Sequence, residues 1–174
     1  MFGRTRLLTA FTTPRLTVRP WEPVLDDTAA RHLLEARLPT LLTPAVLEHL
    51  PPDFGPESGP CGIAHWIEAR RKKAQVSLVE RNSELIGLLF LFSPEGETTR
   101  HLGYLLCEDD WGQGYASELV QGLVAHLQNG PPQILHAGVS VDNPASACVL
   151  LKAGFSEDRP NTQDDIRRFT LAID

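Results

Sequence analysis

Hydrophobic and polar residues alternate in several short segments of the chain, and in other segments the hydrophobic residues recur every three or four positions. The segments with strand character are RLTVRPW (15–21), QVSLVE (75–80), ELIGLLFLF (84–92), RHLGYLLC (100–107), QILHAGVSV (133–141) and RRFTLAID (167–174). Short turns separate the second, third and fourth of these, which favours antiparallel pairing.

Helical spacing predicts helices at residues 26–38, 63–74, 118–128 and 144–155, the last closed by Gly154. Thr43 followed by Pro44 predicts a capped short helix that ends near residue 50. Residues 51–62 contain four prolines and three glycines, which forbid a regular element and indicate either a functional loop or a mobile connector. The order of these elements predicts an α/β or α+β fold around one mostly antiparallel sheet.

The length of 174 residues predicts a single domain, residues 1–174. Its formal net charge is −6, which disfavours nucleic acid as a partner and favours a cationic one. The longest apolar run, residues 85–92, is too short to span a membrane, and LLTAF (7–11) is too short for the core of a secretion signal. These features favour a cytoplasmic protein.

Neither the cysteines nor the histidines have the spacing of a metal site. Three cysteines without a C-x-x-C pair argue against a disulfide framework and against zinc, and favour a reducing compartment. The six histidines lie on separate segments, so we expect no bound metal.

A glycine-rich segment, CEDDWGQG (107–114), connects a predicted strand to a predicted helix, and we call it the glycine loop. The start of a helix offers unpaired N–H groups, and glycine lets a phosphate approach them closely. Taken alone, such a turn is as often structural as ligand-binding. A dinucleotide site would require an opening βαβ unit, whereas this loop follows antiparallel hairpins.

Two segments in the same order and spacing, GYLLCEDDWGQGYASELV and VSVDNPASACVLLKAGF, resemble the acetyl-coenzyme A core of the GNAT superfamily of N-acetyltransferases. They are most similar to the branch that includes the ribosomal-protein alanine N-acetyltransferases. The resemblance covers about residues 16–174, and its specific part is residues 103–155. It implies a mixed, mostly antiparallel sheet flanked by helices, with acetyl-CoA as co-substrate, a cofactor core at about residues 100–155 and no metal.

The resemblance also implies which residues hold the cofactor. The family's pyrophosphate loop is Arg or Gln, two residues, Gly, one residue, then Gly or Ala. This chain matches it except that Trp111 replaces the first residue, a variation that the branch tolerates. The implied pyrophosphate contacts are the backbone groups of Gly112, Gln113, Gly114, Tyr115, Ala116 and Ser117. Backbone groups of Leu106 and Cys107 are implied to bind the pantetheine, and Asn143 and Ser146 to lie at the cofactor.

Amine acetylation requires a base for the amine and a proton for the departing thiolate. Glu108 lies within the glycine loop, beside its glycines, and Asp164 and Asp165 lie where the branch places a catalytic carboxylate, although exposed acids are also common as solvated groups. Tyr104 is a candidate to orient the amine or a water molecule, and its alternative is a half-buried strand residue.

The leaving group has a separate candidate. Many family members donate the thiolate proton from a tyrosine seven residues after the position of Asn143, but this chain has Leu150 there. The branch instead has a serine three residues after that asparagine, here Ser146. Asn143 and Ser146 are equally able to cap the helix that begins at Pro144, and both roles are compatible.

We therefore expect an enzyme that transfers acetyl from acetyl-CoA to a primary amine, at a protein N-terminus or in a small molecule, by direct attack in a ternary complex. Cys107 and Cys148 are expected to be core residues, because direct attack needs no acyl-enzyme. The alternatives are a polyamine, aminosugar or amino-acid acetyltransferase, and a non-catalytic acyl-CoA sensor. No motif identifies the acceptor or the oligomeric state.

Overall fold

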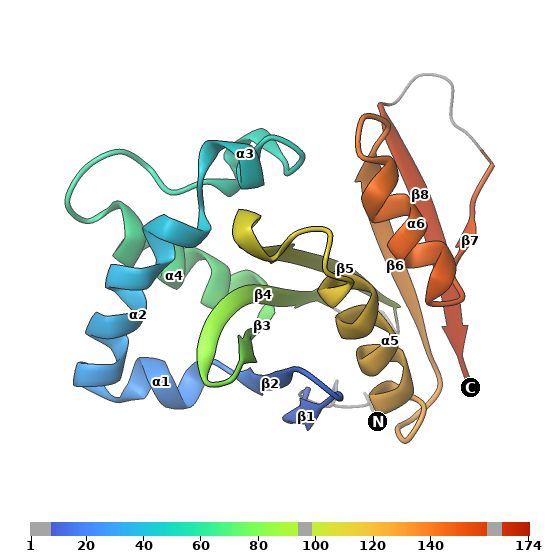
Figure 1. Cartoon of the computed structure of the whole chain (residues 1–174), viewed down its shortest axis with the longest axis horizontal. Coiled ribbons are helices and arrows are strands. Elements are labelled where there is room, and N and C mark those ends of the chain that lie inside the picture. The colour runs from blue at the N-terminus through green and yellow to red at the C-terminus, as the bar shows by residue number, and fades with distance from the viewer. Residues whose placement is uncertain (1–7, 94–98, 160–164) are drawn as a thin grey trace.

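A computed structural model describes residues 8–93, 99–159 and 165–174, and within them eight strands form one sheet (Figure 1). The strand order is β1-β2-β3-β4-β5-β6-β8-β7. The strands are β1 (Phe11–Thr12), β2 (Thr17–Pro20), β3 (Gln75–Arg81), β4 (Glu84–Phe92), β5 (Thr99–Leu106), β6 (Gln133–Ser140), β7 (Ser156–Glu157) and β8 (Ile166–Ile173).

All neighbouring strands are antiparallel except β5 and β6. The parallel ladder between these two is short, and it ends where His101 pairs with His136. β5 then continues to Leu106 and β6 to Ser140, and the two halves of the sheet turn away from each other (Figure 1). The expected mostly antiparallel sheet is confirmed, and its only parallel pair in the described residues is also the place where it divides.

Helices cover both faces of the sheet. One apolar core joins β3 and β4 to α1 (Glu22–Asp26), α2 (Thr28–Leu41), α3 (Pro44–Leu47) and α4 (Gly62–Lys73). A second core joins the sheet to α5 (Tyr115–Leu127) and α6 (Pro144–Lys152). On β4, Leu88 and Phe90 belong to the first core, whereas Leu89 and Leu91 belong to the second. A strand buried on both faces needs no polar alternation, which explains the continuous apolar run ELIGLLFLF.

Capping side chains mark the helix starts in the structure: α2 begins at Thr28, two residues after the expected residue 26, and α3 begins at Pro44 as expected. The Asp27 carboxylate accepts from the Ala30 N–H, and the Thr43 hydroxyl accepts from the Val46 N–H. α3 ends at Leu47, before the expected residue 50, and α5 begins at Tyr115, three residues before the expected start. The glycine backbone at residue 114, rather than the apolar stripe, fixes the start of α5.

Residues 51–62 contain one turn of 3-10 helix, Pro52–Phe54, and are otherwise irregular, as their composition predicts. The middle of this loop is nevertheless anchored. Phe54 is buried, its ring makes T-shaped contacts with those of Trp66 and Phe90, and its carbonyl accepts from the Trp66 indole N–H at 2.5 Å. Within the described residues, no helix is long and apolar enough to cross a bilayer.

Candidate active site

The glycine loop leaves β5 after Leu106, forms a 3-10 turn over Glu108–Asp110 and ends at the first turn of α5. Gly112 and Gly114 have positive φ angles of 71° and 82°, a backbone conformation that residues with a Cβ rarely adopt. A Cβ added to Gly112 would meet no atom within 4 Å. The approach to the loop at Gly112 is therefore open, which fits the close approach of a phosphate to backbone N–H groups at a helix start.

Trp111, the residue that departs from the family pattern, lies across the end of β5. Its indole N–H donates to the Leu106 carbonyl at 2.9 Å, and its side chain remains half exposed. The neighbouring Cys107 N–H donates to the Ile86 carbonyl at 2.8 Å. The Cys107 amide is thus already used within the sheet, whereas the Leu106 carbonyl retains a second lone pair for a ligand.

Tyr104 and Ser146, 42 positions apart in the sequence, meet on the structure. Tyr104 lies on β5 and Ser146 in the first turn of α6, with the two hydroxyl oxygens 2.7 Å apart. Burial raises the pKa of Tyr104, and the hydrogen bond with Ser146 opposes that shift. Tyr104 therefore keeps its proton at neutral pH and is available as a donor.

The cap of α6 comes from Asn143, whose side-chain oxygen accepts the backbone N–H of Ser146 at 3.0 Å. The Ser146 hydroxyl takes no part in that cap, and its contact is with Tyr104. Leu150, in the position of the family's tyrosine, is 1% exposed and belongs to the apolar core beneath α6.

The two described candidate bases lie on different sides of the divergence between β5 and β6. Asp165 is exposed at the start of β8, and its carbonyl accepts from the Val141 N–H just beyond β6. Glu108 follows β5 and accepts a hydrogen bond from the Thr43 hydroxyl at the start of α3. Asp164 lies outside the described residues.

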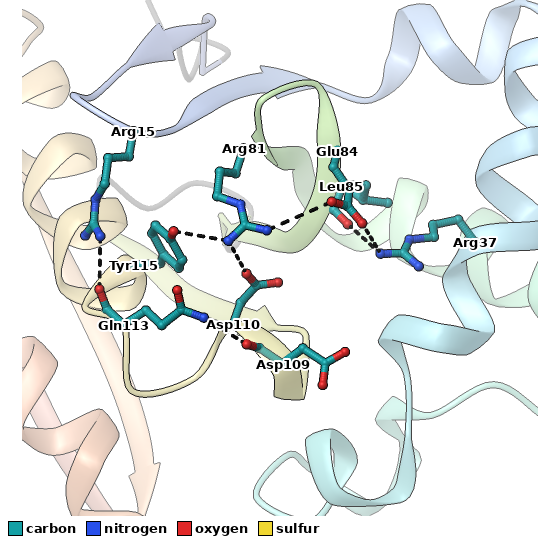
Figure 2. Close-up of polar contacts among 9 residues, drawn as sticks. All are labelled: Arg15, Arg37, Arg81, Glu84, Leu85, Asp109, Asp110, Gln113 and Tyr115. Atoms are coloured by element: carbon teal, nitrogen blue, oxygen red, sulfur yellow. Dashed lines mark hydrogen bonds and ion pairs between the residues drawn. The ribbon is translucent and has the colours of Figure 1, made fainter.

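Arginines that sequence reasoning did not select lie around the glycine loop. Figure 2 shows Arg15 and Arg81 on either side of the Tyr115 ring, with Arg37 reaching in from α2. A cavity of about 440 Å³ opens beside the loop and is lined by Arg37, Thr40, Thr43, Arg81, Glu84, Cys107, Glu108, Asp109, Asp110 and Gln113. Its lining holds four carboxylates against two guanidinium groups, so its formal charge is negative.

Neither metal ligation nor thiol chemistry has support at this site. Among the described residues, no group of three His, Cys, Asp or Glu side chains is placed to hold a metal ion. Burial raises the pKa of the Cys107 thiol, which disfavours the nucleophilic thiolate. Cys148, expected in the core, is instead exposed, since it lies on the outer side of α6.

Comparison with known proteins places this geometry in a family. The family described as acetyltransferase (GNAT) domain matches residues 15–156. The ribosomal-protein-serine acetyltransferase of Escherichia coli is 30% identical over 115 residues, and the match covers 60% of this chain and 64% of that protein.

Solved structures share the fold at lower identity. An acetyltransferase from Salmonella typhimurium, described as modifying the N-terminal serine of ribosomal protein L7/L12, superposes with a TM-score of 0.63 at 19% identity, over 93% of this chain and 97% of that one. Spermidine N-acetyltransferase from Vibrio cholerae, in complex with CoA and spermine, superposes with a TM-score of 0.67 at 16% identity, over 91% of this chain and 96% of that one. The match to an acetyltransferase domain supports the expected enzyme class, an acetyl-CoA-dependent N-acetyltransferase. The family match spans well over half of the residues of this chain, and the chain therefore belongs to the GNAT acetyltransferase family.

Proposed function

We propose that this protein transfers the acetyl group of acetyl-CoA to a primary amine by direct attack of the amine in a ternary complex. The observation that carries the proposal is the 2.7 Å contact between Ser146 and Tyr104, which lies on β5 three residues before the glycine loop. It brings a strand hydroxyl and a helix hydroxyl together at the point where the sheet divides.

The glycine loop and the start of α5 fit the pyrophosphate of acetyl-CoA. Backbone N–H groups from Gly112 to Ser117 would hold the phosphate oxygens, since the helix start supplies a partial positive charge and the space at Gly112 is open. The Leu106 carbonyl would accept from the pantetheine. A pantetheine contact at Cys107 would need the carbonyl rather than the N–H, because Ile86 already accepts the latter.

Three groups divide the chemistry. A carboxylate, Asp165 or its neighbour Asp164 with Glu108 as the alternative, takes a proton from the ammonium form of the acceptor so that the amine nitrogen can attack the thioester carbon. As the carbon–sulfur bond breaks, the Ser146 hydroxyl donates a hydrogen bond to the developing thiolate. Tyr104 holds the Ser146 oxygen, so the proton that the thiolate acquires passes from Tyr104 through Ser146, and the second proton that the attacking nitrogen loses restores the Tyr104 hydroxyl through solvent.

The acceptor is proposed to be cationic. The cavity beside the glycine loop has an excess of carboxylates, and the whole chain carries a formal charge of −6. A protein N-terminus is favoured, because the curated relative is a ribosomal-protein-serine acetyltransferase. A polyamine is the second candidate, because spermidine N-acetyltransferase has the same fold. The free thiols of the three cysteines agree with a cytoplasmic location.

The test is release of free CoA thiol from acetyl-CoA in the presence of peptides with N-terminal serine or alanine, polyamines, aminosugars and amino acids. Turnover with at least one primary amine is expected, and mass spectrometry should locate the acetyl group on that amine. Tight binding of acetyl-CoA without turnover of any acceptor would favour the acyl-CoA sensor.

A further inference from the structure

The glycine loop is held at its first half by Arg81, from the end of β3. The Arg81 guanidinium nitrogen Nη1 lies 3.1 Å from the Asp110 carboxylate, which is only 8% exposed. The same nitrogen donates to the Tyr115 hydroxyl at 3.2 Å. Arg81 thus connects Asp110, two residues before Gly112, to Tyr115, the first residue of α5. Asp110 is nearly buried, so loss of Arg81 would leave its carboxylate without this ion-pair partner, and the contact favours the observed loop conformation.

The second half of the loop is held by Arg15, from the turn between β1 and β2. Its Nη1 donates to the Gln113 carbonyl at 3.1 Å, and its Nε donates to Glu118 on α5 at 2.6 Å. Glu118 also accepts from the Thr13 hydroxyl and from the Arg15 N–H. Burial alone would raise the pKa of Glu118, but these hydrogen bonds together lower it, so the carboxylate stays ionised and paired.

The loop needs such contacts because its own residues are permissive. Gly112 and Gly114 impose little conformational preference, and ordering each residue of a flexible segment costs about 1 to 2 kcal/mol. Trp111 occupies the first position of the motif, but its indole contacts the end of β5 rather than the glycines. Arg15 and Arg81 bind the loop on either side of the glycines, at Gln113 and at Asp110 and Tyr115.

We propose that Arg15 and Arg81 act together as an arginine clamp, a pair of positioning residues that hold residues 110–115 in the shape that binds the pyrophosphate. The clamp raises affinity for acetyl-CoA by ordering the loop before binding, because a preorganised site loses less conformational entropy when the ligand arrives. The inference rests on the proposed function and adds the residues that set cofactor affinity from outside the motif.

The experiment compares wild type with Arg15→Gln and Arg81→Gln. Calorimetry with CoA gives Kd, and steady-state kinetics give KM and kcat with acetyl-CoA and with S-acetylpantetheine, which lacks the pyrophosphate. Each variant is expected to raise Kd for CoA and KM for acetyl-CoA about tenfold, with kcat at saturation nearly unchanged. KM for S-acetylpantetheine should not change. Arg81→Lys, which keeps a charge beside Asp110, should recover part of the affinity.

Arg19→Gln is the matched control. Arg19 forms a two-point ion pair with Glu80, the neighbour of Arg81 on β3, at 2.9 and 2.8 Å, and this pair lies outside the glycine loop. It should lose comparable thermal stability and keep the wild-type Kd. Should Arg81→Gln fail to fold, the half-exposed Arg15 supplies the deciding variant.

The outcomes separate the clamp from the proposed function. Wild-type affinity in both folded variants, an equal loss of affinity in Arg19→Gln, or an equal KM penalty with S-acetylpantetheine would each overturn the clamp alone. A wild-type protein that binds neither CoA nor acetyl-CoA would overturn the proposed function and the clamp with it.

Discussion

Replacing Ser146 with alanine tests the assignment of the leaving-group hydroxyl most directly. The change removes the oxygen that lies 2.7 Å from the Tyr104 hydroxyl but keeps the backbone N–H that Asn143 accepts. The helix cap therefore survives. The expected loss in the free energy of unfolding is about 1 kcal/mol, the net contribution of one neutral hydrogen bond.

The expected loss of activity is larger. Without Ser146 the developing thiolate loses a hydrogen-bond donor placed before the reaction begins, so kcat should fall roughly 10- to 100-fold, or about 1.4 to 2.7 kcal/mol of barrier. Affinity for acetyl-CoA should change little. Because Tyr104 acts through Ser146, Tyr104→Phe should also lower kcat, and the double variant should lose little more than the worse single variant.

The assay is kcat by thiol release with the best acceptor, alongside thermal unfolding of each variant. Thr170→Val is the control. Thr170 lies on β8, two strands away from β5, and its hydroxyl is 3.1 Å from Nδ1 of His136 on β6. It should lose similar stability and keep full kcat. Wild-type turnover in a folded Ser146→Ala protein would refute the reasoning and would mean that solvent protonates the thiolate.

Three further changes test other parts of the site. Gly114→Val should weaken acetyl-CoA binding at least tenfold, about 1.4 kcal/mol, as measured by calorimetry. Gly154→Val, also at a positive φ of 95°, is the control and should lose stability but keep its affinity for acetyl-CoA. Equal affinity of the two variants for acetyl-CoA would count against phosphate binding at Gly114. Asp165→Asn should lower kcat about 100-fold without changing affinity for acetyl-CoA, and full activity around neutral pH would exclude Asp165 as the base. Since the pKa of Glu118 lies below its usual 4.5 in the folded protein, its stabilisation is complete above that pH and is lost as pH falls through the folded pKa. The difference in Tm between wild type and Glu118→Gln should shrink accordingly in acid, and a difference independent of pH would show that ionisation of Glu118 contributes nothing.

Local sequence signals were enough to predict the longer helices and strands and the position of the glycine loop. Thr43 and Asn143 mark helix starts through side chains that bond within three residues, and β4 is recognisable from its own apolar run. The two positive φ angles of the loop follow from glycine itself. By contrast, the two-residue strands β1 and β7 and the five-residue helix α1 are too short to show any periodicity, and packing against neighbours alone defines them.

Only the tertiary structure decided which distant residues meet. Tyr104 and Ser146 were separate candidates in the sequence, and the hydrogen bond between them depends on how α6 packs beside the divided sheet. Arg15 was not a candidate at all, because it lies 98 positions from Gln113 and belongs to no motif. Hydrophobic periodicity fixes which face of an element is buried, but the pairing of charged and polar groups across elements depends on strand order and helix placement, which arise only when the whole core packs.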